Sequence, residues 1–308
     1  MVCGQECPHY EMNERAEFHR PVLVKELIEL LRPEAGQVIV DLTIGGGGHA
    51  EAILEAMGGQ ARLIGIDRDP EAIRFAGERL SRFGAAVQLI HGRFSRLPEH
   101  LDQLGIEKAD RIYADLGVSA RQLESAERGF SFMREGPLDM RMDQSEGEPA
   151  SKILQELSAQ DLEKIFREYG EERFSRRVAK AIERKRKQGL KLGRTRELAG
   201  LVEAEVRSGQ RIHPATRIFQ ALRIYVNEEI QELRQGLKGA AERLEAKGRM
   251  AVISYHSLED REVKQFFRAG EKAGELGILT KKPLVPAETE LRSNPRSRSA
   301  KLRAAERI

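Results

Sequence analysis

The chain has 308 residues, 40% hydrophobic and 33% charged, and its 52 basic residues nearly balance 49 acidic ones for a net charge of +3. This composition is typical of a globular protein with one large domain or two smaller ones, and the charge balance does not by itself indicate a nucleic-acid partner. The sequence has no run of about 18 apolar residues and no leader-like start, so we expect a cytoplasmic protein without a membrane partner.

Two cysteines, Cys3 and Cys7, lie close to His9 near the start of the chain, and the sequence has no other cysteine. Three potential ligands on a terminal segment make a weak zinc site, because structural zinc takes four ligands. We therefore expect free thiols and no bound metal.

Short runs rich in β-branched residues alternate with helical patterns in the first part of the chain. The predicted strands are Val38–Asp41, Arg62–Asp67, Val87–His91 and Arg111–Asp115. Apolar residues at helical spacing occur at 25–31, 50–54 and 70–76. Strands that alternate with helices predict a parallel, doubly wound α/β sheet.

The alternation stops at about residue 151, and the pattern is helical and highly charged to about residue 247. A strand pattern returns at Met250–Tyr255, and two candidate strands of an edge hairpin follow at 278–280 and 301–304. A sheet that is interrupted and then resumed indicates a domain inserted between its strands. We place an all-helical insertion at 129–213 and a discontinuous sheet domain at 1–128 and 214–308.

Four consecutive glycines, Gly45 to Gly48, follow the first strand and lead into a helix. Such a turn lets the backbone approach a ligand at the carboxyl end of a strand, where α/β sheets bind ligands. The run fits the dinucleotide pattern G-x-G-x-x-A, with Asp67 about twenty residues further on to bind a ribose. Asp41 at the end of the first strand favours instead the cationic S-adenosylmethionine, because a carboxylate repels a pyrophosphate.

A second glycine turn, Asp115–Ser119, follows the fourth strand. Residues 127–143 come next and mix aromatic, methionine, arginine and acidic residues without a helical or strand period. This composition predicts a lid or a base-binding wall, with an irregular packed loop as the alternative.

Motifs across almost the whole chain resemble those of the 16S ribosomal RNA N4-cytosine methyltransferases of the RsmH or MraW type. They are Gly47–His49, Ile66–Pro70, His91–Ser95, Asp115–Gln122, Ala126–Asp143, Tyr169–Phe174, His213–Asn227, Ser254–Arg261 and Asn294–Arg296. The resemblance implies a class I (Rossmann-like) methyltransferase fold with an inserted all-helical domain and S-adenosyl-L-methionine as cofactor. It also implies methylation of the cytidine at position 1402, in the decoding centre of the small (30S) subunit.

The family's cofactor contacts, carried onto this sequence, fall on Gly47, Gly48, His49, Asp67, Phe94, Asp115 and Gln122. The resemblance implies that the glycines and His49 border the methionine end and that Asp67 accepts hydrogen bonds from the ribose. It also implies that Phe94 covers the adenine and that Asp115 and Gln122 close the pocket beside the methyl group. A core role for Phe94 and a helix-capping role for Gln122 are the alternatives.

Methyl transfer to the cytosine N4 amino group needs an acceptor for its N–H groups. The catalytic candidates are Asp115, Asp139 and His256, with Ser254 as a further one, and the sequence leaves the choice among them open. No metal is needed, because the leaving sulfonium group becomes neutral.

A flipped base would stack on aromatic side chains, and basic residues would hold the phosphates. The stacking candidates are Phe130, Phe132, Tyr255 and His256. The basic candidates are 184–187, Arg211, Arg217, Arg223, Arg296 and Arg298, although a run such as 184–187 is more often a solvated helix face. A nicotinamide oxidoreductase and a catalytically idle RNA-binding assembly factor are the rival functions. The sequence leaves the oligomeric state open, a homodimer included.

Overall fold

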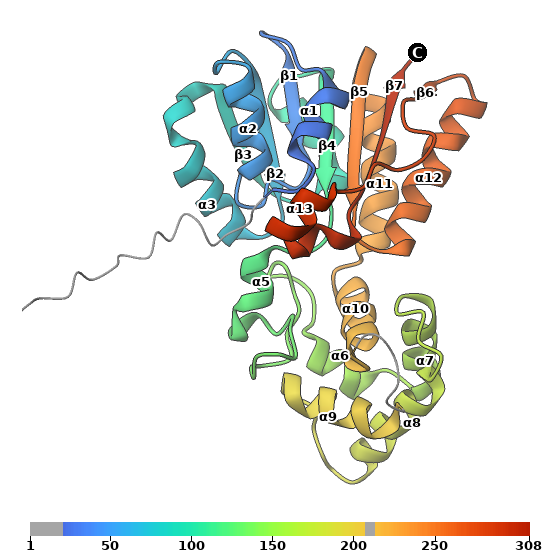
Figure 1. The fold of residues 1–308 in the computed structure, drawn as a ribbon. Coiled ribbons are helices and arrows are strands. Elements are labelled where there is room, and N and C mark those ends of the chain that lie inside the picture. Colours follow the sequence, from blue (N-terminus) through green and yellow to red (C-terminus); the bar gives the residue numbers. More distant parts are fainter. Residues whose placement is uncertain (1–20, 207–212) are drawn as a thin grey trace, which may run out of the picture.

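The protein is described by a computed structural model that covers residues 21–206 and 213–308. Two lobes stand one above the other in Figure 1: a sheet lobe with strands and flanking helices, and below it a helical lobe. Cys3, Cys7 and His9, considered above as metal ligands, lie outside the described residues, as does Arg211.

The sheet lobe is built on a seven-stranded sheet, within the described part of the chain, in the order β3-β2-β1-β4-β5-β7-β6. The strands are β1 Val38–Asp41, β2 Arg62–Asp67, β3 Val87–His91, β4 Ala109–Asp115, β5 Leu244–Ser254, β6 Leu276–Ile278 and β7 Lys301–Arg307. β1 to β5 are parallel, whereas β7 runs antiparallel to both of its neighbours. The sequence therefore correctly predicted a doubly wound, mostly parallel α/β sheet.

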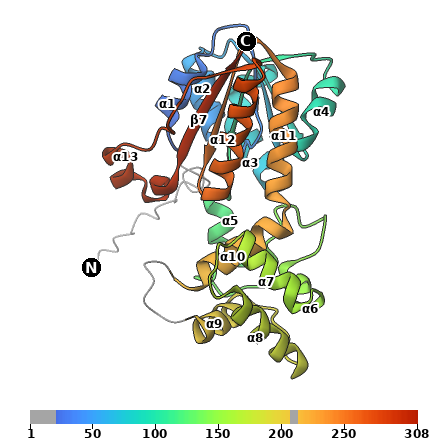
Figure 2. The same ribbon diagram turned by 90° about the vertical axis from the view of Figure 1, so that its right-hand side faces the viewer.

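Helices cover both faces of the sheet because each turns one apolar stripe toward it. α1 Val24–Leu31, α2 Gly48–Ala56 and α3 Pro70–Leu80 share one buried cluster with the first face. α4 Leu97–Gln103, α11 Glu229–Arg243 and α12 Ser257–Lys272 share another cluster with the second face. Figure 2 shows the two layers, with α1 and α2 on one side of β7 and α11 and α4 on the other.

The helical lobe has its own core of leucine, isoleucine, valine and phenylalanine side chains. Its helices are α6 Ala150–Glu156, α7 Ala159–Glu168, α8 Ser175–Lys187, α9 Thr195–Glu205 and α10 Ala215–Val226. In α7, Leu162, Ile165 and Phe166 are buried, and the Ser158 hydroxyl caps the helix by accepting a hydrogen bond from the Asp161 N–H. None of the helices in residues 21–206 and 213–308 is long and apolar enough to cross a membrane.

The helical lobe is inserted between two strands that are direct neighbours, since Ala114 of β4 pairs with Val252 of β5. We placed the end of the insertion at residue 213, but the structure extends it through α10. Ile218, Phe219 and Leu222 of that helix lie in the core of the helical lobe. The apolar pattern of α10 is the same whichever lobe it faces, so the sequence alone could not place this boundary.

The last strands form the predicted antiparallel pair, with one difference in its bounds. The pair lies at the edge of the sheet, as expected, with β6 outermost and β7 next to β5. β6 ends at Ile278, where we expected a strand to begin. The intervening basic segment 294–299 contains a short 3-10 helix, and it is preceded by α13 Glu288–Ser293.

Candidate cofactor site

A cleft lies at the carboxyl ends of β1, β2 and β4. One wall comes from the glycine turn after β1 and from the ends of β2 and β4. The facing wall includes Met142, Asn227 and the first turns of α11. Doubly wound sheets bind their ligands at this edge, so the cleft is the candidate cofactor site.

The glycine turn supplies the wall beside β1. The residues of this turn that line the cleft are Ile44, Gly45, Gly46, Gly48 and His49. Gly47 does not line it: its φ is +77°, and a Cβ there would lie 3.3 Å from the Leu80 side chain of α3. Gly47 therefore shapes the turn from behind, against α3, while its neighbours present backbone to the cleft.

Asp67, at the end of β2, lines the cleft with both carboxylate oxygens held by backbone donors. The Gly45 N–H donates to Oδ2 and the Asp69 N–H to Oδ1, each at 2.9 Å. Burial raises the pKa of Asp67 to about 6, and the two N–H donors limit the rise. A fixed carboxylate with lone pairs to spare fits a ligand that offers a pair of hydroxyls.

Asp115, at the end of β4, lies between two side chains that come from different parts of the chain. The Tyr255 hydroxyl donates to Oδ1 at 2.8 Å, and His49 Nδ1 lies 3.6 Å from Oδ2. His49 Nε2 donates to the Val22 carbonyl at 2.8 Å, and burial lowers its pKa. The carboxylate is therefore oriented in the cleft beside a neutral imidazole.

Phe94 and Gln122 both line the cleft, and each also has a structural contact. The Phe94 ring packs against Gly236 of α11, where a Cβ would come within 2.3 Å of it. Gln122 accepts from the Ser119 N–H at 2.9 Å and donates to Asp69 at 2.7 Å. Gln122 therefore caps α5 Ala120–Glu124, as the alternative predicted, and it also lines the cleft.

Acidic side chains outnumber basic ones in the lining of the cleft. The carboxylates that line it are Asp67, Asp115, Glu229, Glu232 and Glu259. Arg223 pairs with Glu229, Arg93 pairs with Glu232, and Arg68 also lines the cleft. The charge of Asp67 and Asp115 is therefore what favours a cationic sulfonium and amino group over a pyrophosphate. The three glutamates were not predicted from the sequence. They lie on α11 and α12, whose many other charged residues face solvent, and the sequence does not show which of these charges face the cleft.

At one end of the cleft, Arg223 makes two hydrogen bonds of 2.8 Å to the Glu229 carboxylate. His256 Nε2 lies 3.1 Å from Glu259, so Glu229, His256 and Glu259 form a group with the ligand types of a metal site. Arg223 already neutralises Glu229 and would repel a divalent cation beside it. The donors therefore fit a structural ion-pair cluster better than a metal centre.

The expectation that Asp41 faces the cofactor is wrong. It is 2% exposed and is absent from the lining of the cleft, so it does not face the cofactor space as we expected. Its Oδ1 accepts a hydrogen bond from the Thr43 N–H at 3.0 Å. Burial raises its pKa to about 7, with Asp115 and Asp67 adding to the rise.

Of the catalytic candidates, the structure brings Asp115 alone into the cleft wall. Asp139 forms a two-pronged ion pair with Arg141 outside the wall, and its pKa is lowered mainly by those contacts against the effect of burial. His256 caps the N-terminus of α12. Ser254 is buried in β5, where its hydroxyl donates to the Lys301 carbonyl.

The aromatic candidates for base stacking are divided among different environments. Phe130 is 6% exposed in the core of the helical lobe, so the expectation that it stacks on a base is wrong. Phe132 stacks on His213, with 4.4 Å between ring centroids. The Tyr255 hydroxyl donates a hydrogen bond to Asp115, which fixes its ring beside that carboxylate.

The basic candidates are also mostly engaged. Arg296 pairs with Glu124 of α5 Ala120–Glu124, whereas Arg298 is exposed and has no ion-pair partner among the described residues. In the 184–187 run, Arg186 donates to three carbonyls of the segment 154–157. Arg184, Lys185 and Lys187 are exposed, so the run is mainly a solvated face of α8, as the alternative held, and Arg186 alone of the four makes these structural contacts.

Comparison with known proteins now adds to this geometry. Residues 16–308 match the MraW methylase family. A ribosomal RNA small subunit methyltransferase H from Syntrophotalea carbinolica is 49% identical, over 94% of this chain and 98% of its own. A protein of the same name from Trichlorobacter lovleyi is 47% identical, over 95% and 99%.

The chain is also similar to a solved rRNA methylase from Streptococcus thermophilus, with 12% identity, coverage of 92% of this chain and 93% of that one, and a TM-score of 0.44. The identity of the curated relatives, over nearly their full length, and the family match together decide the assignment. The chain belongs to the MraW methylase family.

Proposed function

We propose that the protein transfers a methyl group from S-adenosyl-L-methionine to N4 of the cytidine at position 1402 of 16S ribosomal RNA, in the small subunit and in the cytoplasm. The curated relatives, named as ribosomal RNA small subunit methyltransferases, support the substrate class. The single observation that carries the chemistry is the carboxylate-lined cleft at the ends of β1, β2 and β4.

In the proposed site, the cofactor lies along the carboxyl edge of the sheet. Asp67 accepts hydrogen bonds from the ribose hydroxyls, the backbone of Gly46 and Gly48 borders the methionine end, and Phe94 packs on the adenine. Gly47 acts from behind by shaping the turn, and Gln122 contributes to the wall beside Asp115. The carboxylates match the charge of the sulfonium cofactor.

Methyl transfer then needs little covalent help from the protein. The lone pair of the cytosine N4 attacks the methyl carbon, the carbon–sulfur bond breaks, and its electron pair returns to sulfur, which becomes neutral. N4 gains a positive charge and loses one proton. We assign Asp115 as the acceptor that orients the amino group and takes up this proton, because Tyr255 fixes it in the wall.

The test is methylation of small subunits from cells that lack this protein, with labelled cofactor and mapping of the modified nucleoside. We expect one labelled N4-methylcytidine, at position 1402. Incorporation at another base or at a carbon atom contradicts the assignment. No incorporation despite RNA binding supports the idle assembly factor.

Asp115→Asn, with Asp139→Asn as its matched control, tests the acceptor. Loss of a proton acceptor costs about 10²–10⁴ in kcat, so we expect that loss for Asp115→Asn alone. Equal effects of the two substitutions on kcat would contradict the role of Asp115.

A further inference from the structure

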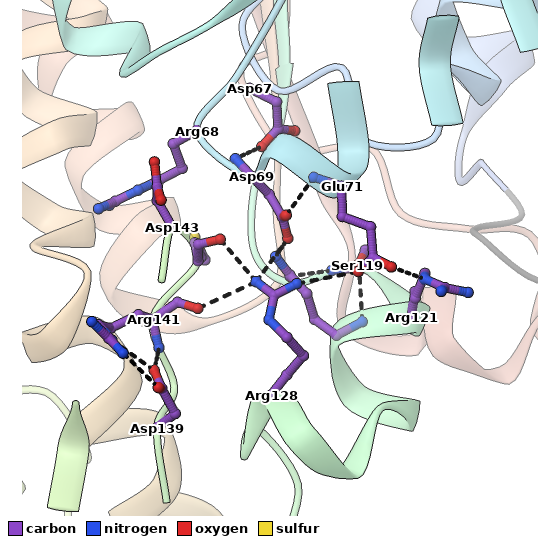
Figure 3. Close-up of polar contacts among 12 residues, drawn as sticks. Asp67, Arg68, Asp69, Glu71, Ser119, Arg121, Arg128, Asp139, Arg141 and Asp143 are labelled. Carbon is purple, nitrogen blue, oxygen red and sulfur yellow. Dashed lines mark hydrogen bonds and ion pairs between the residues drawn. The ribbon is translucent and has the colours of Figure 1, made fainter. Parts of the chain in front are cut away.

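Arg128 is a buried cation at the boundary between the lobes, and it is 8% exposed. Figure 3 shows its guanidinium reaching two groups of acceptors at once. On the side of the sheet lobe, Nη2 donates to Asp69 at 2.9 Å and Nη1 to Glu71 at 3.3 Å. On the other side, Nη2 donates to the carbonyls of Arg141 at 3.2 Å and Met142 at 2.8 Å.

The Asp69 contact leads directly to the cofactor wall. Asp69 is 3% exposed and caps α3, because its Oδ1 accepts the Glu71 N–H. Its own N–H donates to Asp67, and its Oδ2 also accepts from Gln122. Movement of Asp69 would therefore displace two residues that line the cleft.

The Met142 contact leads to the facing wall. Met142 lines the cleft, and its N–H donates to the Asn227 side chain at 2.8 Å. The Asn227 carbonyl in turn accepts from Arg68 at 2.7 Å. The segment 141–143 is thus held between Arg128 on one side and Asn227 on the other.

We propose that Arg128 is a positioning residue: by binding Asp69 and the Met142 carbonyl together, it fixes the separation of the two walls and so sets the affinity for the cofactor. This inference rests on the proposed placement of S-adenosyl-L-methionine in the cleft. Arginine suits the task because its planar fork holds several acceptors in fixed directions, whereas the lysine ammonium is a point charge.

Arg121 provides a matched control. It pairs with the same Glu71 carboxylate, at 2.7 Å, but on the surface, with 40% of its side chain exposed. Affinity for S-adenosyl-L-homocysteine is measured by calorimetry for Arg128→Ala, Arg128→Lys and Arg121→Ala, well below each unfolding temperature. We expect a loss of about tenfold or more for Arg128→Ala, a smaller loss for Arg128→Lys, and less than about twofold for Arg121→Ala.

A double-mutant cycle with Met142→Ala separates positioning from general support of the fold. Met142→Ala keeps the backbone carbonyl that Arg128 binds but removes the side chain that this contact would position. If Arg128 acts by positioning that side chain, replacing Arg128 in the Met142→Ala background weakens cofactor binding less than it does in the wild type. Additive losses overturn the proposal, and so do unchanged affinities accompanied by a lower unfolding temperature. Should Arg128→Ala not fold, Arg128→Lys completes the same cycle.

Asp67→Ala distinguishes failure of this inference from failure of the cofactor placement. If Asp67→Ala leaves the affinity unchanged, the placement in the cleft is wrong, and the proposal falls with it. If Asp67→Ala weakens binding while Arg128→Lys and Arg128→Ala do not, the placement stands and only the role of Arg128 is overturned.

Discussion

Among single residues, the acids at the ends of neighbouring strands differ in what they face. Asp67 and Asp115 line the cleft, whereas Asp41 is enclosed behind it. Burial raises the pKa of both Asp41 and Asp67. The consequence for Asp67 concerns binding, and the consequence for Asp41 concerns stability.

Cofactor affinity should fall as the pH drops through about 6, the pKa of Asp67. Above that pH the ionised carboxylate can accept from both ribose hydroxyls, and protonation removes acceptor capacity. Asp67→Ala should weaken binding by about 1–3 kcal/mol at pH 8 and remove this pH dependence. Calorimetric titration between pH 5 and 8 checks both, and a pH profile that Asp67→Ala leaves unchanged would refute the ribose assignment.

Asp41→Asn should stabilise the protein at alkaline pH. The pKa of Asp41 rises from an ordinary value near 3.8 to about 7 on folding, so ionisation penalises the folded state. The penalty is absent below pH 3.8, grows as the pH rises to about 7 and is constant above it. Asparagine keeps an acceptor for the Thr43 N–H, and the gain at pH 9 is at most about 4 kcal/mol.

Urea unfolding of the wild type and of Asp41→Asn across this pH range measures the difference. The two curves should converge in acid and separate toward neutral pH. A constant gap at every pH would show that Asp41 does not change its protonation in this way.

At the scale of elements, α11 packs against a residue of the cleft wall at one glycine, Gly236. Gly236 lets the helix approach the Phe94 ring, and Phe94 lines the cleft on its other side. Gly236→Ala forces the ring outward, because the new Cβ would lie 2.3 Å from its Cδ2. We expect a stability loss of about 1–3 kcal/mol and weaker cofactor binding.

Gly200→Ala in α9 is the control, since nothing lies within 4 Å of a Cβ at that exposed position. There the same substitution should stabilise the helix by about 0.5–1 kcal/mol. Unfolding curves and cofactor titration of both variants give the comparison. If Gly236→Ala binds the cofactor as well as Gly200→Ala does, then Phe94 is not part of the adenine site.

The elements themselves were largely predictable, and the reason is physical. Mainly buried parallel strands have largely apolar sequences, so β1, β2 and β4 were found to within two residues at each end. The edge strand β3 is only partly buried, and its bounds were found as well. The predictions that were wrong concern packing between elements. The side on which α10 is buried and the direction of the Asp41 side chain are decided by partners distant in sequence.

The candidate site was predictable to a similar degree. The positions at the strand ends, Asp67 and Asp115, follow from topology, because parallel strands end at one edge. The glutamates of α11 and α12 do not, since their helices carry many other charges. Arg128 was hidden for the same reason: nothing in its neighbourhood of the sequence distinguishes a buried guanidinium from an exposed one.

For the molecule as a whole, the basic segment 294–299 adjoins α5, since Arg296 pairs with Glu124. Exposed Arg298 on the same turn is the better candidate for a phosphate contact. Arg298→Ala should weaken RNA binding and reduce the salt slope by about 1, without changing cofactor affinity. Binding of small-subunit RNA over a salt series tests this. If the salt dependence of Arg298→Ala equals that of the wild type, Arg298 does not contact the RNA.

The position of β7 also has a consequence for how the enzyme is made. Because residues 301–307 lie between β5 and β6, the sheet stays open until translation has delivered them from the ribosomal tunnel. Until then the nascent chain exposes the unpaired backbone edge of β5, which is a template for aggregation. Early folding of the nascent helical lobe would not protect that edge, so we expect the nascent chain to depend on chaperones that shield extended segments until β7 has paired.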